Sequence, residues 1–257
     1  MFVAIFLLLC FVVYMWWEAH RNRVVSVELA LADFPESVRA LTIFFISDIH
    51  RRKVSEEIIE KVEGKADFVL IGGDLMEKGV PFARVKENLR RLKQIGPVYF
   101  VWGNNDYEAD YHELDALLLH EGVRILDNCA VMFESEKGEK VALIGVDDIS
   151  KRRARLDLAL LDADDAAFRI VACHNPEIVR AIRPEHRISL VLSGHTHGGQ
   201  IRFGSFGLYE KGGVKQVNGT TVFISNGYGT TNLPLRFGAP AETNLITIRR
   251  GEEDDRS

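Results

Sequence analysis

Residues 41–50, LTIFFISDIH, place a continuous apolar run directly before Asp48 and His50. A short run of this kind, rich in β-forming residues, predicts a strand that is buried on both faces. Alternation along an extended chain places the side chains of Asp48 and His50 on the same side. Carboxylate and imidazole groups together suit divalent ions such as Mn²⁺, Fe²⁺ or Zn²⁺. This stretch therefore predicts a buried strand that ends at a pair of metal ligands.

The same arrangement recurs at four further places along the chain. The apolar runs 68–71, 98–102, 168–173 and 188–193 are each followed closely by Asp, Asn or His. Open α/β sheets place ligand sites at the carboxyl ends of their strands, so we expect these side chains to meet at one edge. A single motif of this kind occurs mostly by chance, whereas five in order favour a functional site. The expected metal ligands are Asp48, His50, Asp74, Asn104, His174, His195 and His197.

The number of these ligands indicates how many ions they hold. Seven are too many for one tetrahedral ion, and they suit two ions about 3.5–4 Å apart that share one carboxylate. The intervening sequence predicts helices at residues 55–64, 81–94, 109–120 and 177–182. It also predicts two hairpins, the first joining strands 129–134 and 140–146 and the second turning at Asn218-Gly219, before a last strand at 243–248. This order indicates one α/β domain built on two sheets.

The first 17 residues, MFVAIFLLLCFVVYMWW, are apolar at every position. A helix of that length reaches about 25 Å, the short end of what spans a bilayer. Trp16 and Trp17 are typical of a membrane interface, and Arg21 and Arg23 follow them. A cleavable signal peptide would need a positive start and a small-residue cleavage site, and a buried helix is the other alternative. We expect a retained single-pass anchor in the cell membrane, with the catalytic domain on the cytoplasmic side because basic residues follow the span.

The predicted organisation has four parts. Residues 1–20 form the anchor, 21–40 a juxtamembrane segment with a first strand, 41–250 one domain, and 251–257 an acidic tail. The chain has 257 residues, 47% of them hydrophobic, which excludes a disordered or collagen-like protein. Its net charge of −5 argues against non-specific binding of nucleic acid. Cys10 lies in the apolar segment, and the absence of metal-type spacing predicts that Cys129 and Cys173 are buried thiols in a reducing compartment.

The motif order resembles that of the calcineurin-like metallophosphoesterases. The matching motifs are Asp48-x-His50, Gly73-Asp74, Gly103-Asn104, His174 and Gly194-His195-x-His197. The resemblance covers residues 41–249, and residues 225–248 are similar to the C-terminal signature of a bacterial membrane-anchored branch. It implies an α/β fold in which two mixed sheets form a four-layer α/β/β/α sandwich, preceded by one N-terminal transmembrane helix.

The resemblance also implies which residues hold each ion. Its pattern gives one metal to Asp48, His50, Asp74 and His197, and the second to Asp74, Asn104, His174 and His195, with Asp74 bridging. The implied cofactors are two divalent ions, with Mn²⁺ preferred over Fe²⁺ or Zn²⁺. A metal-bridging hydroxide would attack the phosphorus of a phosphoester or pyrophosphate.

The sequence departs from the family at Asn105, where the family usually has histidine. An Asn amide donates a hydrogen bond but cannot give up a proton, so the leaving group must depart without an acid. A pyrophosphate linkage meets that condition, because the departing phosphate has a second pKa of about 6. Asn105 and Asp106 are the catalytic candidates, with Asp106 expected to orient the loop. Arg51 and Arg52 could hold a phosphate or an anionic headgroup, although a solvated cationic turn is equally consistent with the sequence.

These observations predict a membrane-tethered dinuclear phosphoesterase. Its expected substrate is a lipid-linked or membrane-surface phosphate compound, because a tether raises the effective concentration of substrates at the bilayer. One alternative is a broad phosphodiesterase or nuclease. The other, suggested only by Asn105, is a non-catalytic metal-binding protein.

Overall fold

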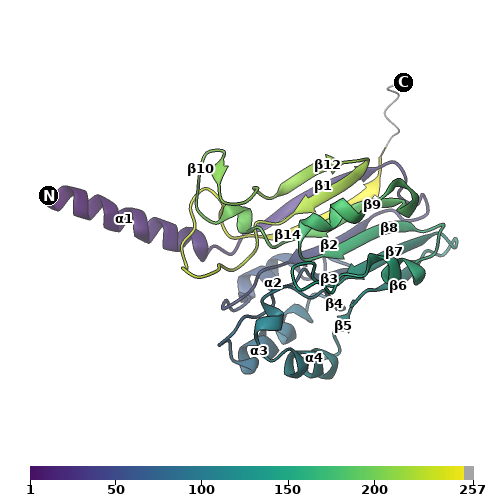
Figure 1. The fold of residues 1–257 in the computed structure, drawn as a ribbon, viewed down its shortest axis with the longest axis horizontal. Coiled ribbons are helices and arrows are strands. Elements are labelled where there is room, and N and C mark those ends of the chain that lie inside the picture. The colour runs from purple at the N-terminus through teal and green to yellow at the C-terminus, as the bar shows by residue number, and fades with distance from the viewer. Residues whose placement is uncertain (252–257) are drawn as a thin grey trace.

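The computed structural model describes residues 1–251 and contains two six-stranded mixed sheets packed face to face (Figure 1). The first sheet has the order β1-β14-β2-β3-β4-β5. In it β14 runs antiparallel to β2, and the other neighbours are parallel. Its strands are β1 (Val24–Leu31), β14 (Thr243–Arg250), β2 (Leu41–Ile46), β3 (Phe68–Ile71), β4 (Val98–Phe100) and β5 (Arg124–Ile125).

The second sheet has the order β12-β13-β9-β8-β7-β6. Its two outer pairs are the antiparallel hairpins predicted from sequence, and the four inner strands are parallel. Its strands are β12 (Gly213–Val217), β13 (Thr220–Ile224), β9 (Ile188–Ser193), β8 (Phe168–Cys173), β7 (Lys140–Val146) and β6 (Cys129–Glu134).

Helices cover both outer faces, which gives four layers. The helices α2 (Glu56–Val62), α3 (Phe82–Leu92) and α4 (Tyr111–His120) pack on the first sheet through a buried apolar cluster. The short α5 (Leu156–Leu161) and the 3₁₀ helix η2 (Pro176–Ala181) cover the second. A third cluster fills the space between the sheets, where the rings of Phe45 and Phe223 meet edge to face at 6.1 Å. The expected α/β/β/α sandwich is therefore confirmed.

Local differences from the sequence expectations have identifiable causes. The helix expected at 109–120 begins at Tyr111, because the Asp110 side chain accepts a hydrogen bond from the Glu113 N–H and caps it. The segment expected as a helix at 177–182 is the 3₁₀ helix η2, which starts at Pro176. In the expected acidic tail, residues 252–257 lie outside the described residues.

The N-terminal helix α1 (Phe2–Ala19) extends away from the sheets in Figure 1. It is long and apolar enough to cross a membrane. Its last turns contact the domain, where Met15, Glu18 and Ala19 are buried. The strand β1 follows and pairs along its whole length with β14, so this segment belongs to the first sheet.

Candidate metal centre

The strand ends bring the predicted ligands together where the two sheets meet. Asp48 and His50 follow β2, Asp74 follows β3, His174 follows β8, and His197 follows β9. Their ligand atoms form two overlapping clusters, each with all atoms within 4.8 Å of one another. The clusters are Asp48–His50–His197 and Asp48–Asp74–His174, and all their members are buried.

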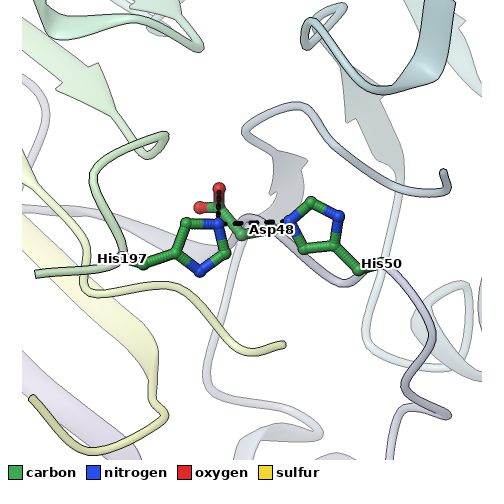
Figure 2. Close-up of side chains that lie close together, drawn as sticks. All are labelled: Asp48, His50 and His197. Carbon is green, nitrogen blue, oxygen red and sulfur yellow. Dashed lines mark hydrogen bonds and ion pairs between the residues drawn. The ribbon is translucent and has the colours of Figure 1, made fainter. Parts of the chain in front are cut away.

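Figure 2 shows the first cluster, in which His197 meets Asp48 and His50 from a distant part of the chain. The Nε2 atom of His197 lies 3.2 Å from Asp48 Oδ1 and 3.2 Å from His50 Nε2. The other ring nitrogen of His50, Nδ1, lies 3.1 Å from Glu77 Oε2. A carboxylate on the outer nitrogen orients an imidazole that binds metal through the inner one. Sequence reasoning did not identify Glu77.

The second cluster tests whether these residues fit a cation. The Nδ1 atom of His174 contacts the Gly72 carbonyl at 2.8 Å, so with Nδ1 protonated Nε2 carries a lone pair. That Nε2 lies 3.2 Å from Asp74 Oδ2 and has no hydrogen-bond partner among the described residues. The Oδ1 atom of Asn104 is likewise buried without a donor in residues 1–251. Buried nitrogen and oxygen lone pairs without a donor, beside the Asp74 carboxylate in the case of His174, suit a divalent ion, so the donor set fits.

The charges of the buried side chains also favour a cation in the centre. Burial disfavours the charged form of Asp48, but the charges of His197, His174 and His50 outweigh it and hold its pKa well below its usual range. Burial lowers the pKa of His174, yet the carboxylates of Asp74 and Asp48 raise it to about 10. The two buried carboxylates therefore favour positive charge at this position, as a divalent ion would provide.

Asp74 can serve both halves of the centre, as the resemblance implied. Its Oδ2 lies 3.7 Å from His50 Nε2 and 3.2 Å from His174 Nε2. In the structure the residue common to both ligand clusters is Asp48, whereas Asp74 belongs to the second cluster only. His195 is in neither cluster, although its ring centroid lies 5.0 Å from that of His174 and its N–H donates to the Asp48 carboxylate. Asn104 lines the adjoining cleft.

The backbone at the strand ends is unusual. Five ligand residues have positive φ between 50° and 71°, a region that non-glycine residues rarely adopt. They are Asp48, His50, Asp74, His195 and His197. Such strain persists where the surrounding structure imposes it, and it is concentrated at functional sites. Gly73, with φ +84°, permits the approach of His174, since a Cβ there would lie 2.6 Å from its Nδ1.

The loop after β4 places Asn105 and Asp106 against Asp74. The N–H and side-chain amide of Asn105 donate to the two oxygens of Asp74 at 2.8 and 2.7 Å. Asp106 is buried and accepts from the N–H groups of Asp74, Gly103 and Met76 at 2.9–3.0 Å. Burial, then the charge of Asp74, raises the pKa of Asp106 to about 7. Asp106 thus positions the loop, and Asn105 contacts the ligand itself.

The two arginines expected to bind substrate lie elsewhere. The guanidinium of Arg52 stacks on the Tyr228 ring at 3.7 Å and donates to the carbonyls of Tyr228, His20 and Arg21. It therefore joins the end of α1 to the domain. Arg51 pairs with Glu77 and donates to the Lys78 carbonyl. The structure does not bring either arginine into the cleft beside the metal ligands.

Two further residues belong to the centre and were missed. Asp148 is buried, follows β7, and feels the charges of His174 and His195. The ligands were predicted because each closely follows an apolar strand, and the same reasoning would have identified Asp148. Arg236 is fully buried and donates to the carbonyls of His197, Ala239, Gly227 and Gly229. No spacing in the sequence marks it.

A cleft of about 470 Å³ opens beside the centre. Its lining joins two kinds of surface. The polar part contains Asp74, Asn104, Asn105, His195 and His197. The apolar part contains Ile201, Leu208 and Leu233.

Comparison with known proteins places this geometry in a family. The family model of the calcineurin-like phosphoesterases matches residues 41–199. The chain is 49% identical over 210 residues to the uncharacterized protein YpbG of Bacillus subtilis, covering 81% of each. It is 31% identical over 262 residues to a Danio rerio transmembrane protein with a metallophosphoesterase domain, covering 90% of this chain but 58% of that protein.

A solved structure supports the fold alone. A putative 5'-nucleotidase from Staphylococcus aureus superposes with a TM-score of 0.51 at 13% identity, covering 85% of this chain and 56% of that one. The match to the family model extends over more than half of the 257 residues and contains all the predicted ligands. The chain belongs to the calcineurin-like phosphoesterase family.

Proposed function

We propose that this chain is a membrane-tethered phosphoesterase that uses two divalent ions, preferably Mn²⁺, to hydrolyse a lipid-linked phosphate or pyrophosphate. The observation that carries the proposal is the cleft, because predicted metal ligands and apolar side chains both line it. A substrate with a phosphate group and a lipid portion matches both surfaces. The family supports the hydrolase part, and the apolar helix α1 supports the tether.

Seven residues would hold the two ions. One ion would take Asp48, His50, Asp74 and His197, and the other Asp74, Asn104, His174 and His195. When bound, the ions would activate the attacking water and stabilise the negative charge of the phosphoryl oxygens. The chain orients the donors: the Gly72 carbonyl fixes His174, and Glu77 fixes His50.

Asn105 supports a pyrophosphate bond as the one that is cleaved. Its amide lies at the cleft and can donate a hydrogen bond to a phosphoryl oxygen, but it cannot protonate a leaving group. An alkoxide leaves poorly without a proton, whereas a phosphate departs as a stable anion. We therefore expect faster hydrolysis of a nucleoside-diphosphate-linked lipid than of an alkyl diester.

The Asn105→His variant is expected to hydrolyse an alkyl phosphodiester about 100-fold faster than the natural chain, because the imidazole supplies the missing proton. A p-nitrophenyl diester is the matched substrate, since its leaving group departs without protonation and its hydrolysis should change little. Steady-state kinetics with Mn²⁺ on both diesters and on the diphosphate-linked lipid measures this.

Three results would count against the proposal. If the natural chain cleaves the alkyl diester faster than the diphosphate-linked lipid, the pyrophosphate preference is wrong. Hydrolysis of DNA at a comparable rate would favour the broad phosphodiesterase or nuclease. Metal-reconstituted protein that hydrolyses none of these compounds would favour the non-catalytic alternative.

The proposed orientation puts the domain in the cytoplasm, because Arg21 and Arg23 follow the apolar segment. In intact spheroplasts, a C-terminal tag should then resist protease added outside and become sensitive only after lysis. Digestion before lysis would reverse the orientation.

A further inference from the structure

Four large apolar side chains lie exposed in the segments that contribute to the cleft lining, and two of them, Leu208 and Leu233, line the cleft itself. The other two, Phe203 and Phe206, belong to the hairpin of β10 (Arg202–Phe203) and β11 (Phe206–Gly207). Leu208 follows directly, and Leu233 comes from the loop before β14. Their exposures are 63%, 80%, 80% and 60% in chain order. We call these four residues the apolar rim.

The rim lies beside the docked part of α1, and Figure 1 shows β10 next to the end of this helix. Phe237 connects the two, because its ring centroid lies 5.1 Å from Phe11, 6.3 Å from Tyr14 and 5.0 Å from Phe203. The neighbouring Arg236 N–H donates to the Met15 carbonyl at 2.9 Å. The rim is thus held in a fixed position relative to the helix.

This contact sets the depth of the rim relative to a membrane that contains α1. Trp16 and Trp17 are half exposed, and tryptophan favours the interface between headgroups and acyl chains. Phe11 precedes Trp16 by five residues, which is about 8 Å along a helix toward the membrane interior. The Phe237 ring packs on Phe11 and Tyr14, so it lies on the membrane side of the tryptophan pair. Interfacial amphipathic helices bury their apolar faces about 5–10 Å into the boundary between headgroups and acyl chains, which is comparable to the distance of about 8 Å between Phe11 and Trp16 along the helix.

We propose that the apolar rim inserts into the leaflet beside α1, so that the cleft receives the lipid portion of its substrate directly from the bilayer. This inference rests on one part of the proposed function, namely that α1 spans the membrane. The continuity of the rim with the apolar surface of α1 favours a lipid occupant, because one hydrocarbon phase then covers both. Leu208 and Leu233 also line the cleft, and they connect the inserted surface to the metal ligands.

Spin labels report this depth in the full-length protein. A nitroxide is attached at Phe206→Cys or Leu208→Cys after Cys10 and Cys129 are replaced by alanine, while the buried Cys173 is kept. The matched control is Leu161→Cys, which is equally exposed at 80% but lies on α5, against β6 and β7. In Figure 1 those strands lie at the end away from α1. A label at Leu8→Cys, in the exposed part of α1, reports the tether itself.

The measurement compares collisions with oxygen and with a water-soluble nickel chelate in nanodiscs of phosphatidylethanolamine and phosphatidylglycerol. If the rim inserts, labels at Phe206→Cys, Leu208→Cys and Leu8→Cys should collide more often with oxygen than with the nickel chelate. The label at Leu161→Cys should collide more often with the nickel chelate. Nickel access at 206 and 208 with oxygen access at 8 would overturn the inference and leave the tether intact. Nickel access at all four positions would refute the tether as well. Phosphoesterase assays on soluble substrates test the activity separately.

Discussion

The Asp74→Asn variant is expected to lose at least about 1,000-fold in kcat for phosphoester hydrolysis, because in the proposed centre this one carboxylate would bind both ions. Its Oδ2 lies within 3.7 Å of His50 Nε2 and 3.2 Å of His174 Nε2. An amide keeps the shape but removes the negative charge that two cations need. The charge also raises the pKa of His174, so its removal lowers that pKa.

The measurement pairs kinetics with the metal content of purified protein. Asp147→Asn is the control, because Asp147 is equally buried but accepts from Tyr107 and Arg153 and belongs to neither ligand cluster. That variant should lose stability and still bind two ions. If Asp74→Asn retains both its metal and its activity, Asp74 is not a shared ligand.

The ligands could be predicted because their positions follow from strand topology. An apolar run that is buried on both faces must end at the sheet edge, and Asp48, Asp74 and His174 each follow such a run. The carboxyl ends of parallel strands lie at the same edge of a sheet. Residues that follow different strands are therefore close together in space. The same topology explains why the two-sheet sandwich could be predicted, while details such as η2 depend on the local turn chemistry at Asn175 and Pro176.

The functions of the arginines could not be predicted, because they depend on contacts between segments far apart in the sequence. Arg52 follows the first ligand pair and suits a phosphate, but its partners are Tyr228 and the end of α1. Only the packing of α1 on the domain decides between these roles. Asp148 is different, since it closely follows the apolar strand β7. The reasoning that predicted the other ligands from the ends of apolar strands would have included it.

Substitution of Arg236 is the second change for which we expect a large effect, because its buried guanidinium holds several loops of the centre together. It donates to the carbonyls of Gly227, Gly229, Ala239 and His197, and its Nη2 lies 3.3 Å from His197 Nδ1. Burial lowers its pKa to about 10, so it remains charged near neutral pH. In Arg236→Met the carbonyls of Gly229 and Ala239 lose their donor inside the protein, where each unpaired group costs about 1–3 kcal/mol, whereas those of His197 and Gly227 keep the N–H groups of Gln200 and Glu242.

We therefore expect Arg236→Met to lower the midpoint of thermal unfolding by about 10 °C and to weaken Mn²⁺ binding about 10–100-fold. The second effect follows because the variant removes the contact to the His197 ring and one of the two donors to its carbonyl. Arg169→Met is the matched control, since Arg169 is also a buried arginine that donates to carbonyls, those of His186 and Asp164, but lies outside the centre. Calorimetry on both variants separates the two roles. Equal loss of Mn²⁺ affinity in both would show that Arg236 acts through general stability, whereas loss in Arg236→Met alone would show that it positions His197.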